Sequence, residues 1–310
     1  MITNAIKKKR RLSRLNRSDS IWGWIFISVP LLGILLFTFI PVIMSVYVSL
    51  LDWTGFSSLS KAEFVGLQNF ADIFGGIYLN DFLVAVGNTF VMMLSVPIGM
   101  VLSLLLALAL NKDIPGKSVY RVIYYIPCIA NTVAVTILFN RLFSENGVIN
   151  QIMNLFGIGP VAWLYRPGPA KAMLIILLVW KGLGYTTLLY LAGLQGVNSE
   201  YYEAADLDGA NPVQKLIKIT LPLIAPMTFY IIVTGVMNAL QLYTEPSIMF
   251  PYTQGKGPMD GTSTVMVLLY YQYNTLHNMG SASAIAWVLA VMIMIVTALQ
   301  FFVNNRRQKD

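Results

Sequence analysis

Six long stretches of this chain contain no charged residue, or a single lysine, and no other feature constrains its fold as strongly. A membrane-spanning helix needs about 20 mainly apolar residues, and each stretch is long enough to hold one. The last also holds a non-spanning segment, and the GSAS at Gly280–Ser283 marks where its span begins. The sequence therefore predicts an all-α integral membrane protein with six transmembrane helices in one domain, residues 21–305. The stretches are Ile21–Leu51, Phe82–Leu110, Val122–Asn140, Ala172–Gln195, Ile219–Thr244 and Gly261–Asn305.

Composition supports a membrane protein over a soluble one. Hydrophobic residues make up 56% of the 310 residues and charged residues only 11%, whereas a soluble domain carries about 25% charged residues. A cleaved signal peptide would have an apolar region of about 7–15 residues. Ile21–Leu51 is far longer and lacks a small-residue cleavage pattern at its end, so we expect a retained anchor.

The distribution of lysine and arginine predicts the orientation, since these residues favour the cytoplasmic side. Six spans place 15 of the 21 on the side of the N-terminal tail and five on the other, with Lys181 inside a span. We therefore expect both termini in the cytoplasm, as a basic tail (1–20) and a short tail (306–310). The tail serves as a topological signal or lies on the anionic inner leaflet. Topology explains the net charge of +7 without a nucleic-acid partner.

Residues for catalysis, metal binding or energy conversion are missing. One cysteine, Cys128, and one histidine, His277, predict neither a disulfide framework nor a metal site. The GKS at Gly116–Ser118 lacks the glycine that a phosphate-binding loop needs at position 111, which is Asn111. Only Lys181 is clearly ionisable within a span, with no acidic neighbour in the span cores. The chain is therefore not expected to be an enzyme. A membrane-embedded enzyme and an ion-coupled secondary carrier are alternatives that would need these missing groups.

A polar module, Glu200–Pro222, interrupts the apolar sequence on the side predicted to be cytoplasmic. Asn198 or Ser199 can cap a short helix that ends at Gly209, a residue suited to the left-handed conformation after a helix. Asn211, with Pro212 and Gln214 after it, predicts the start of a second helix. The first helix has an apolar face with small alanines at its centre. It fits a partner's groove or, alternatively, packs on its own domain.

The module resembles the EAA signature of ATP-binding cassette importer permeases. The signature begins with Glu203, Ala204 and Ala205, and three residues separate these from Gly209. Nine residues then separate Gly209 from Ile219, and one more separates Ile219 from Leu221 and Pro222. Nearly the whole chain is similar to the sugar-permease branch that contains the MalF-type maltose subunits. The segment Gly255–Pro258 reads GKGP where such permeases often have GGP. The similar segments are FVGLQNF (64–70), NTF (88–90), YYIP (124–127), ENGVIN (145–150), DGA (208–210) and GSASAIAW near the last span.

This resemblance implies an ABC type I importer (MetI/MalF-like) permease fold and a multi-pass location in a bacterial cell membrane. It implies that loop 198–222 couples the chain to a separate ATPase dimer, which binds ATP and Mg while this chain binds no cofactor. Other implied partners are a second homologous permease, an extracytoplasmic solute-binding protein and membrane lipid. The implied cargo is a carbohydrate, an oligosaccharide in particular, with glycerol phosphate or another polyol as the alternative. The coupling residues would be Glu203, Ala204, Ala205, Asp206 and Gly209.

A sugar path needs hydrogen-bonding groups and aromatic faces inside the bundle, because polar groups that face lipid are costly. The alternative role for such residues is hydrogen bonding between helices. Asn238 and Gln241, three residues apart, share a helix face, as do Lys181 and Tyr185, four apart. Lys181 either extends to the membrane surface or meets Glu245. The candidates are Asn131 and Thr132 in the third span, Lys181, Gly182 and Tyr185 in the fourth, and Asn238, Gln241 and Tyr243 in the fifth.

Overall fold

The computed structural model describes residues 22–112 and 115–307. The basic tail 1–20 lies outside these residues, as do residues 308–310 of the C-terminal tail. Helices dominate the described chain, and the one small sheet pairs two two-residue strands in antiparallel register, Leu51 with Phe64 and Asp52 with Glu63. The elements are η1 (Leu35–Phe39), α2 (Ile40–Val48), β1 (Leu51–Asp52), η2 (Leu59–Lys61), β2 (Glu63–Phe64), α3 (Gln68–Phe74), α4 (Leu79–Met93), α5 (Ser95–Asn111), α6 (Lys117–Ile129), α7 (Thr132–Leu142), α8 (Val148–Leu155), α9 (Pro167–Gln195), α10 (Glu200–Leu207), α11 (Pro212–Lys215), η3 (Leu216–Thr220), α12 (Leu221–Leu223), α13 (Ala225–Leu240), α14 (Thr244–Met249), η4 (Pro251–Thr253), η5 (Pro258–Asp260), α15 (Val265–Asn274) and α16 (Met279–Arg307).

The six predicted spans are present, but two of them are sharply bent. Four helical stretches are long and apolar enough to cross a membrane: Trp22–Val48, Leu79–Asn111, Pro167–Gln195 and Met279–Arg306. The other two spans are pairs of helices, α6 with α7 at 97° and α11–α12 with α13 at 68°. The predicted start of the last span near Gly280 is confirmed, since α16 begins at Met279.

Residues near each bend interrupt the helical pattern. Pro127 lies inside α6, where it removes the backbone donor of one helical hydrogen bond, and the helix ends before Ala130, which adopts an extended conformation. Asn131 then starts α7, and its side chain accepts hydrogen bonds from the amides of Val133 and Ala134. At the second bend, Ile224 leaves helical geometry just before α13, which has a proline in its first turn.

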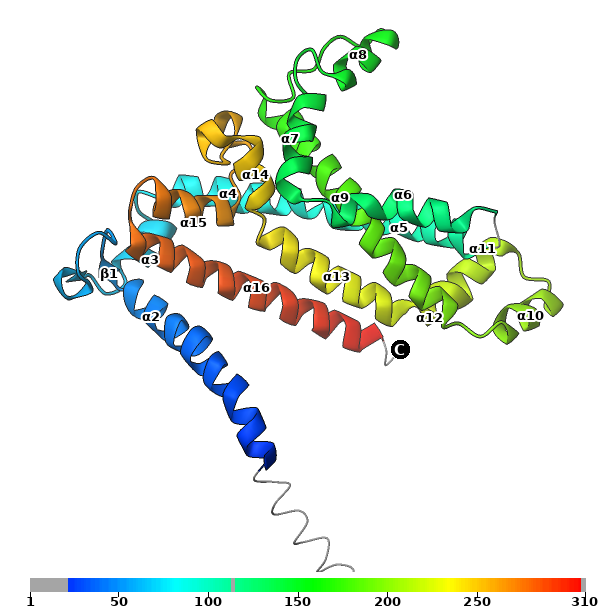
Figure 1. Cartoon of the computed structure of the whole chain (residues 1–310), viewed down its shortest axis with the longest axis horizontal. Helices are drawn as coiled ribbons and strands as arrows, with labels where there is room; N and C mark the ends of the chain where they lie inside the picture. Colours follow the sequence, from blue (N-terminus) through cyan, green and yellow to red (C-terminus); the bar gives the residue numbers. More distant parts are fainter. Residues whose placement is uncertain (1–21, 113–114, 308–310) are drawn as a thin grey trace, which may run out of the picture.

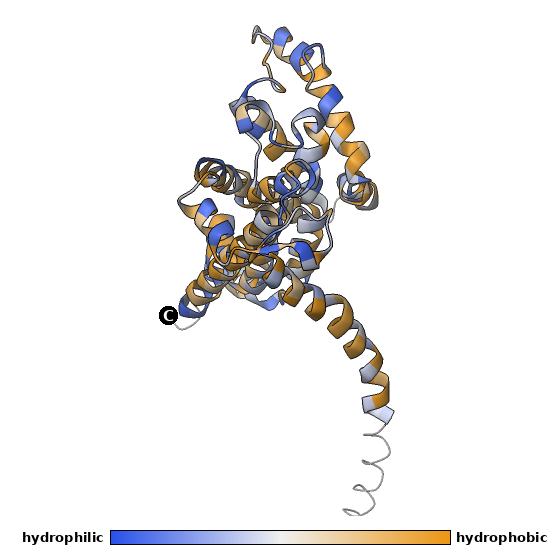
Figure 2. Cartoon of the chain, turned by 90° about the vertical axis from the view of Figure 1, so that its left-hand side faces the viewer, coloured by the Kyte–Doolittle hydropathy of each residue, from blue (hydrophilic) through white to orange (hydrophobic). Residues whose placement is uncertain are grey.

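The central helices lie side by side along the long axis of the molecule (Figure 1). α9 packs on α5 and α6, while α13 contacts α4, α5, α9 and α16. The helix Trp22–Val48 projects from this bundle and contacts α16 through α2 (Figure 1). Hydrophobic residues predominate along it (Figure 2), and its most apolar window has no buried residue. This exposed apolar surface suits a helix surrounded by lipid or by other membrane helices.

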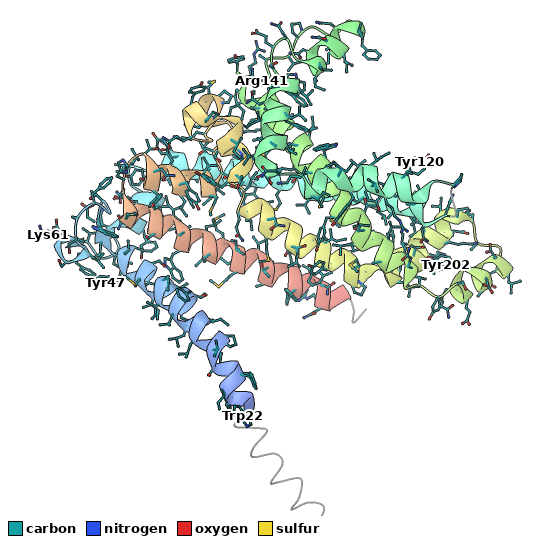
Figure 3. The ribbon with its side chains drawn as sticks, viewed as in Figure 1. Trp22, Tyr47, Lys61, Tyr120, Arg141 and Tyr202 are labelled. Atoms are coloured by element: carbon teal, nitrogen blue, oxygen red, sulfur yellow. The ribbon has the colours of Figure 1, made fainter. Side chains whose placement is uncertain are left out.

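One end of the bundle is fastened by a buried asparagine in the FVGLQNF segment. Asn69, in α3, donates hydrogen bonds from Nδ2 to the carbonyl oxygens of Ser49 (2.9 Å) and Leu51 (3.0 Å). Its Oδ1 accepts one from the Ser281 hydroxyl at 3.2 Å. Asn69 thus joins the end of the first helix to the start of the last. Lys61 lies at this end, whereas Tyr120 and Tyr202 lie at the opposite end (Figure 3).

We predict that Gly184→Ala destabilises the bundle, because a Cβ at Gly184 would stand 2.6 Å from the Tyr124 carbonyl oxygen. Overpacking of this kind costs about 1–3 kcal/mol. Gly182→Ala, on the same helix, is the matched control, since its Cβ would have no neighbour within 4 Å. Thermal unfolding of the purified chain should show a lower melting temperature for the Gly184 variant alone. Equal stability of the two variants would contradict this packing.

Candidate functional site in a polar cavity and an acidic loop helix

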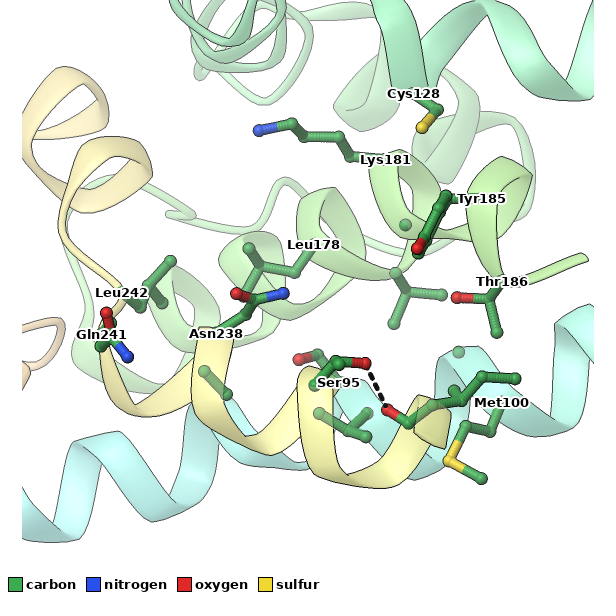
Figure 4. Close-up of a pocket in the computed structure, with 18 of the residues that line it drawn as sticks. Ser95, Met100, Cys128, Leu178, Lys181, Tyr185, Thr186, Asn238, Gln241 and Leu242 are labelled. Carbon is green, nitrogen blue, oxygen red and sulfur yellow. Dashed lines mark hydrogen bonds between the residues drawn. The ribbon is translucent and has the colours of Figure 1, made fainter. Parts of the chain in front are cut away.

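A cavity of about 690 Å³ lies between α5, α6, α9, α13 and the segment that follows α13 (Figure 4). Its wall combines hydrogen-bonding groups with aromatic rings and aliphatic side chains. Tyr230, Thr234 and Asn238 follow one another at intervals of four along α13, so they share one helix face. The polar and aromatic lining residues are Ser95, Cys128, Lys181, Tyr185, Thr186, Tyr230, Thr234, Asn238, Gln241, Tyr243, Thr244 and Glu245.

The cavity brings together six of the eight residues predicted for a substrate path. These are Lys181, Gly182, Tyr185, Asn238, Gln241 and Tyr243.

Asn131 and Thr132, the other two residues predicted for the path, do not line this cavity. Asn131 caps α7 instead, because the broken third span leaves the first amides of α7 without helical partners. The Thr132 hydroxyl accepts a hydrogen bond from Lys181. Sequence reasoning missed Tyr230 and Thr234, although their four-residue spacing from Asn238 is a visible signal.

Lys181 forms an ion pair inside the protein. Its Nζ lies 2.8 Å from Oε1 of Glu245 and donates a hydrogen bond to the Thr132 hydroxyl at 2.7 Å. Glu245 is 8% exposed. Of the two positions predicted for Lys181, the structure shows the contact with Glu245. Glu245 lies in α14, after α13 ends at Leu240, so the acidic partner comes from the segment that follows the fifth span and not from a span core.

Hydrogen bonds hold the turn between α13 and α14 in place. Thr264 donates from its hydroxyl to the Leu242 carbonyl oxygen at 2.6 Å, and Tyr243 stacks on Tyr270 with 3.9 Å between ring centroids. Asn140, in α7, donates to the Met249 carbonyl oxygen at 2.8 Å. These contacts fix the backbone that presents Gln241, Tyr243 and Glu245 to the cavity.

The polar loop folds largely as its sequence predicts. The helix α10 is capped by Asn198, whose Oδ1 accepts a hydrogen bond from the Glu200 amide at 3.2 Å, while Ser199 makes no side-chain capping bond. Gly209 follows the helix at φ +73°, a conformation that glycine adopts without strain. Asn211 and Gln214 form a reciprocal capping box at the start of α11.

Two side-chain contacts attach α10 to the helices that follow it. The hydroxyls of Tyr202 and Thr220 lie 2.9 Å apart, and Asp206 forms an ion pair with Lys215. Ala205 is 8% exposed, so it faces its own chain. The helix therefore packs on its own domain through this face, as one of its two predicted uses requires.

The outward face of α10 carries the rest of the acidic motif. Glu203, Ala204 and Gly209 are exposed, and Leu207 exposes 91% of its surface. Asp206 keeps 66% of its side chain exposed while it pairs with Lys215.

Comparison with known proteins decides the family. The sequence model of the family described as "Binding-protein-dependent transport system inner membrane component" matches residues 73–309. The chain belongs to this family. It is therefore a multi-pass membrane permease of a transport system that depends on a binding protein.

Several relatives match the permease over almost its full length. A probable ABC transporter permease protein, YesP, of Bacillus subtilis is 35% identical, covering 96% of this chain and 94% of its own length. The lactose transport system permease protein LacF of Rhizobium radiobacter is 30% identical, covering 96% and 98%. The trehalose/maltose transport system permease protein MalF of Thermococcus litoralis is 31% identical, with the same coverage.

A solved structure confirms the type I importer fold of the permease. A chain of a bacterial alginate ABC transporter, crystallised with an alginate pentasaccharide-bound periplasmic protein, superposes with a TM-score of 0.80. It is 23% identical, and the match covers 96% of the permease and 99% of that chain.

We predict that Cys128, the only cysteine of the permease, reacts in the folded chain with a small water-soluble thiol reagent, because it lines the cavity. Gly182→Phe should slow the reaction several-fold, since this position also lines the cavity and has open space around it. Leu105→Phe, on the exposed surface of α5, serves as the control. Mass spectrometry of the labelled chain gives the rates. Identical rates in both variants would count against a shared cavity.

Proposed function

We propose that this permease forms half of the translocation path of an ATP-binding cassette importer for a carbohydrate, an oligosaccharide in particular. The observation that carries the proposal is the cavity lined by Tyr185, Asn238, Gln241 and Tyr243. Amide groups hydrogen-bond hydroxyls, and aromatic rings offer apolar faces to a ring-shaped cargo. The lactose and trehalose/maltose permeases among its relatives support a sugar as cargo.

The charge of the cavity supports an uncharged sugar over glycerol phosphate. Lys181 is the cation that an anionic cargo would use, but its Nζ already contacts the Glu245 carboxylate at 2.8 Å. A phosphate bound at Nζ would lie beside this carboxylate and would be repelled by its like charge. A neutral sugar would meet no such repulsion.

Energy would come from a separate ATPase dimer that binds ATP and Mg, while the permease itself binds no cofactor. Nucleotide-driven closure of the ATPase would move the exposed face of α10. The contacts of Tyr202 with Thr220 and of Asp206 with Lys215 connect α10 to α11 and η3. These helices continue through the 68° bend into α13, which carries Asn238. Movement of the loop would thereby reach the cavity wall.

The remaining partners complete an alternating-access cycle in a bacterial cell membrane. A loaded solute-binding protein would dock on the outer segments, and a second homologous permease would supply the other half of the path. Both termini and loop 198–222 would lie in the cytoplasm. An ion-coupled carrier is less well supported, because Glu245 is the one acidic residue among the described residues that line the cavity, and its carboxylate is paired with Lys181.

We predict that Glu203→Lys and Gly209→Asp abolish ATP-driven uptake while the permease still inserts into the membrane. Glu203 is on the exposed face of α10, so charge reversal would repel a partner's basic groups. Gly209 has a positive φ that a side chain would strain, and this strain would displace α10. Asn305→Lys, at an exposed position near the end of α16, adds a positive charge outside the loop; it is the control and should transport normally. Normal uptake by both loop variants would refute the coupling role.

We also predict that Asn238→Leu and Gln241→Leu lower carbohydrate uptake at least about fivefold, since loss of a cargo hydrogen bond costs about 1–3 kcal/mol. The leucines fill similar volumes, so insertion and folding should be retained. Asn305→Leu, an exposed position near the end of α16, controls for the change of side chain. Uptake of labelled sugar into vesicles that contain all subunits measures the effect. Unchanged uptake in both cavity variants would mean that cargo passes elsewhere.

A further inference from the structure

The wall of the cavity contains two charged residues, and they are of opposite sign. Among the described residues that line it, Lys181 and Glu245 are charged and all the others are neutral. Their side chains are 23% and 11% exposed. The other ion pairs in the described chain lie in the polar loop and in the segment 256–260. The charge of the cavity therefore depends on this pair alone.

A hydrogen bond to a third residue, Thr132, also holds the Lys181 side chain in place. The Thr132 hydroxyl accepts this bond from Nζ of Lys181 at 2.7 Å, and Nζ lies 2.8 Å from Oε1 of Glu245. Lys181 thus has two oxygen partners from two different helices. Removal of Glu245 would leave the threonine oxygen as its described side-chain partner, and the positive charge would be uncompensated.

We propose that Glu245 is a specificity-determining residue of the cavity. Its carboxylate balances the positive charge of Lys181 and leaves the cavity neutral, so that the cavity accepts uncharged cargo. Without Glu245, the same wall would attract anionic groups, such as the carboxylates of uronic-acid sugars. The statement about cargo rests on the proposed function, whereas the cancellation of charge does not.

A purely structural role for the pair makes a different prediction. Removing one partner of a buried ion pair leaves an uncompensated charge, whereas removing both partners is often tolerated. If the pair served only to join α9 to α14, the single variants would be less stable and the double variant would recover, but none of them would discriminate between anionic and cationic reagents. If the pair sets the charge of the cavity, the two single variants would change that discrimination in opposite directions and the double variant would resemble the original chain.

Cys128 provides a probe of this charge that needs no cargo. It lines the same cavity, and its Cβ is 3.4 Å from the position that a Cβ on Gly184 would occupy, one helical turn from Lys181. A cationic and an anionic methanethiosulfonate reagent of similar size would be applied to the full-length permease in membrane vesicles. The variants would be Glu245→Gln, Lys181→Met and the double substitution, with Cys128→Ser as the blank.

The expected result concerns the ratio of anionic to cationic labelling rates. One uncompensated charge at roughly 10 Å changes this ratio roughly tenfold at an intermediate dielectric constant. The ratio should rise in Glu245→Gln, fall in Lys181→Met, and stay within about twofold of the original in the double variant. Each single variant tests the proposal independently, should the other fail to fold. A ratio that is the same in every folded variant would overturn it.

A second measurement addresses cargo. In vesicles with all subunits, Glu245→Gln should lower uptake of a neutral oligosaccharide about tenfold, and the added Lys181→Met should restore most of it. A shifted labelling ratio with normal uptake in Glu245→Gln would overturn the specificity role. If the proposed function itself were wrong, the unaltered complex would take up no carbohydrate, and this result is distinct from any difference between the variants.

Discussion

The structure depends on one constraint: backbone N–H and C=O groups within a membrane must find their partners inside the protein. Four spans meet it as uninterrupted helical stretches. The two bent spans break the helix and need local substitutes. At the first break, the Asn131 side chain accepts the hydrogen bonds of two amides of α7. At the second, the Ile224 amide still donates to the Thr220 carbonyl oxygen, and Ile224 is 1% exposed. Both breaks therefore leave the nearby backbone hydrogen-bonded.

These two breaks also arrange the candidate functional site. The first places Thr132 at the start of α7, within reach of Lys181 on α9. The second sets the loop helices at an angle to α13, so that one end of this unit carries the acidic motif and the other carries Asn238. Because Tyr202 and Asp206 attach α10 to the residues before the bend, the loop and α13 are connected through a short, hydrogen-bonded path.

Local features of the fold could be predicted from sequence, and features that depend on distant contacts could not. Span positions follow from apolar length, and the positive φ of Gly209 and the Asn211–Gln214 capping box follow from residues within a few positions. The bends are different. Pro30, Pro41 and Pro97 lie within spans that are not sharply bent, whereas the span with Pro127 bends by 97°, so proline alone does not identify a sharp bend. The burial of Ala205 and the pairing of Lys181 with Glu245, 64 residues apart, are set by packing between segments that periodicity does not describe.

Stability alone does not account for the ion pair in the cavity. Burying two charges costs desolvation energy that their attraction often only balances, and apolar residues of similar size are frequently as stable or more so. An apolar wall at this position would, however, offer nothing to the hydroxyl groups of a sugar. A neutral pair of opposite charges provides strong donors and acceptors without a net field that would bind counterions. The position of Lys181 and Glu245 in the wall, beside Gln241 and Tyr243, thus suits a cavity that must hold an uncharged polar cargo briefly and then release it.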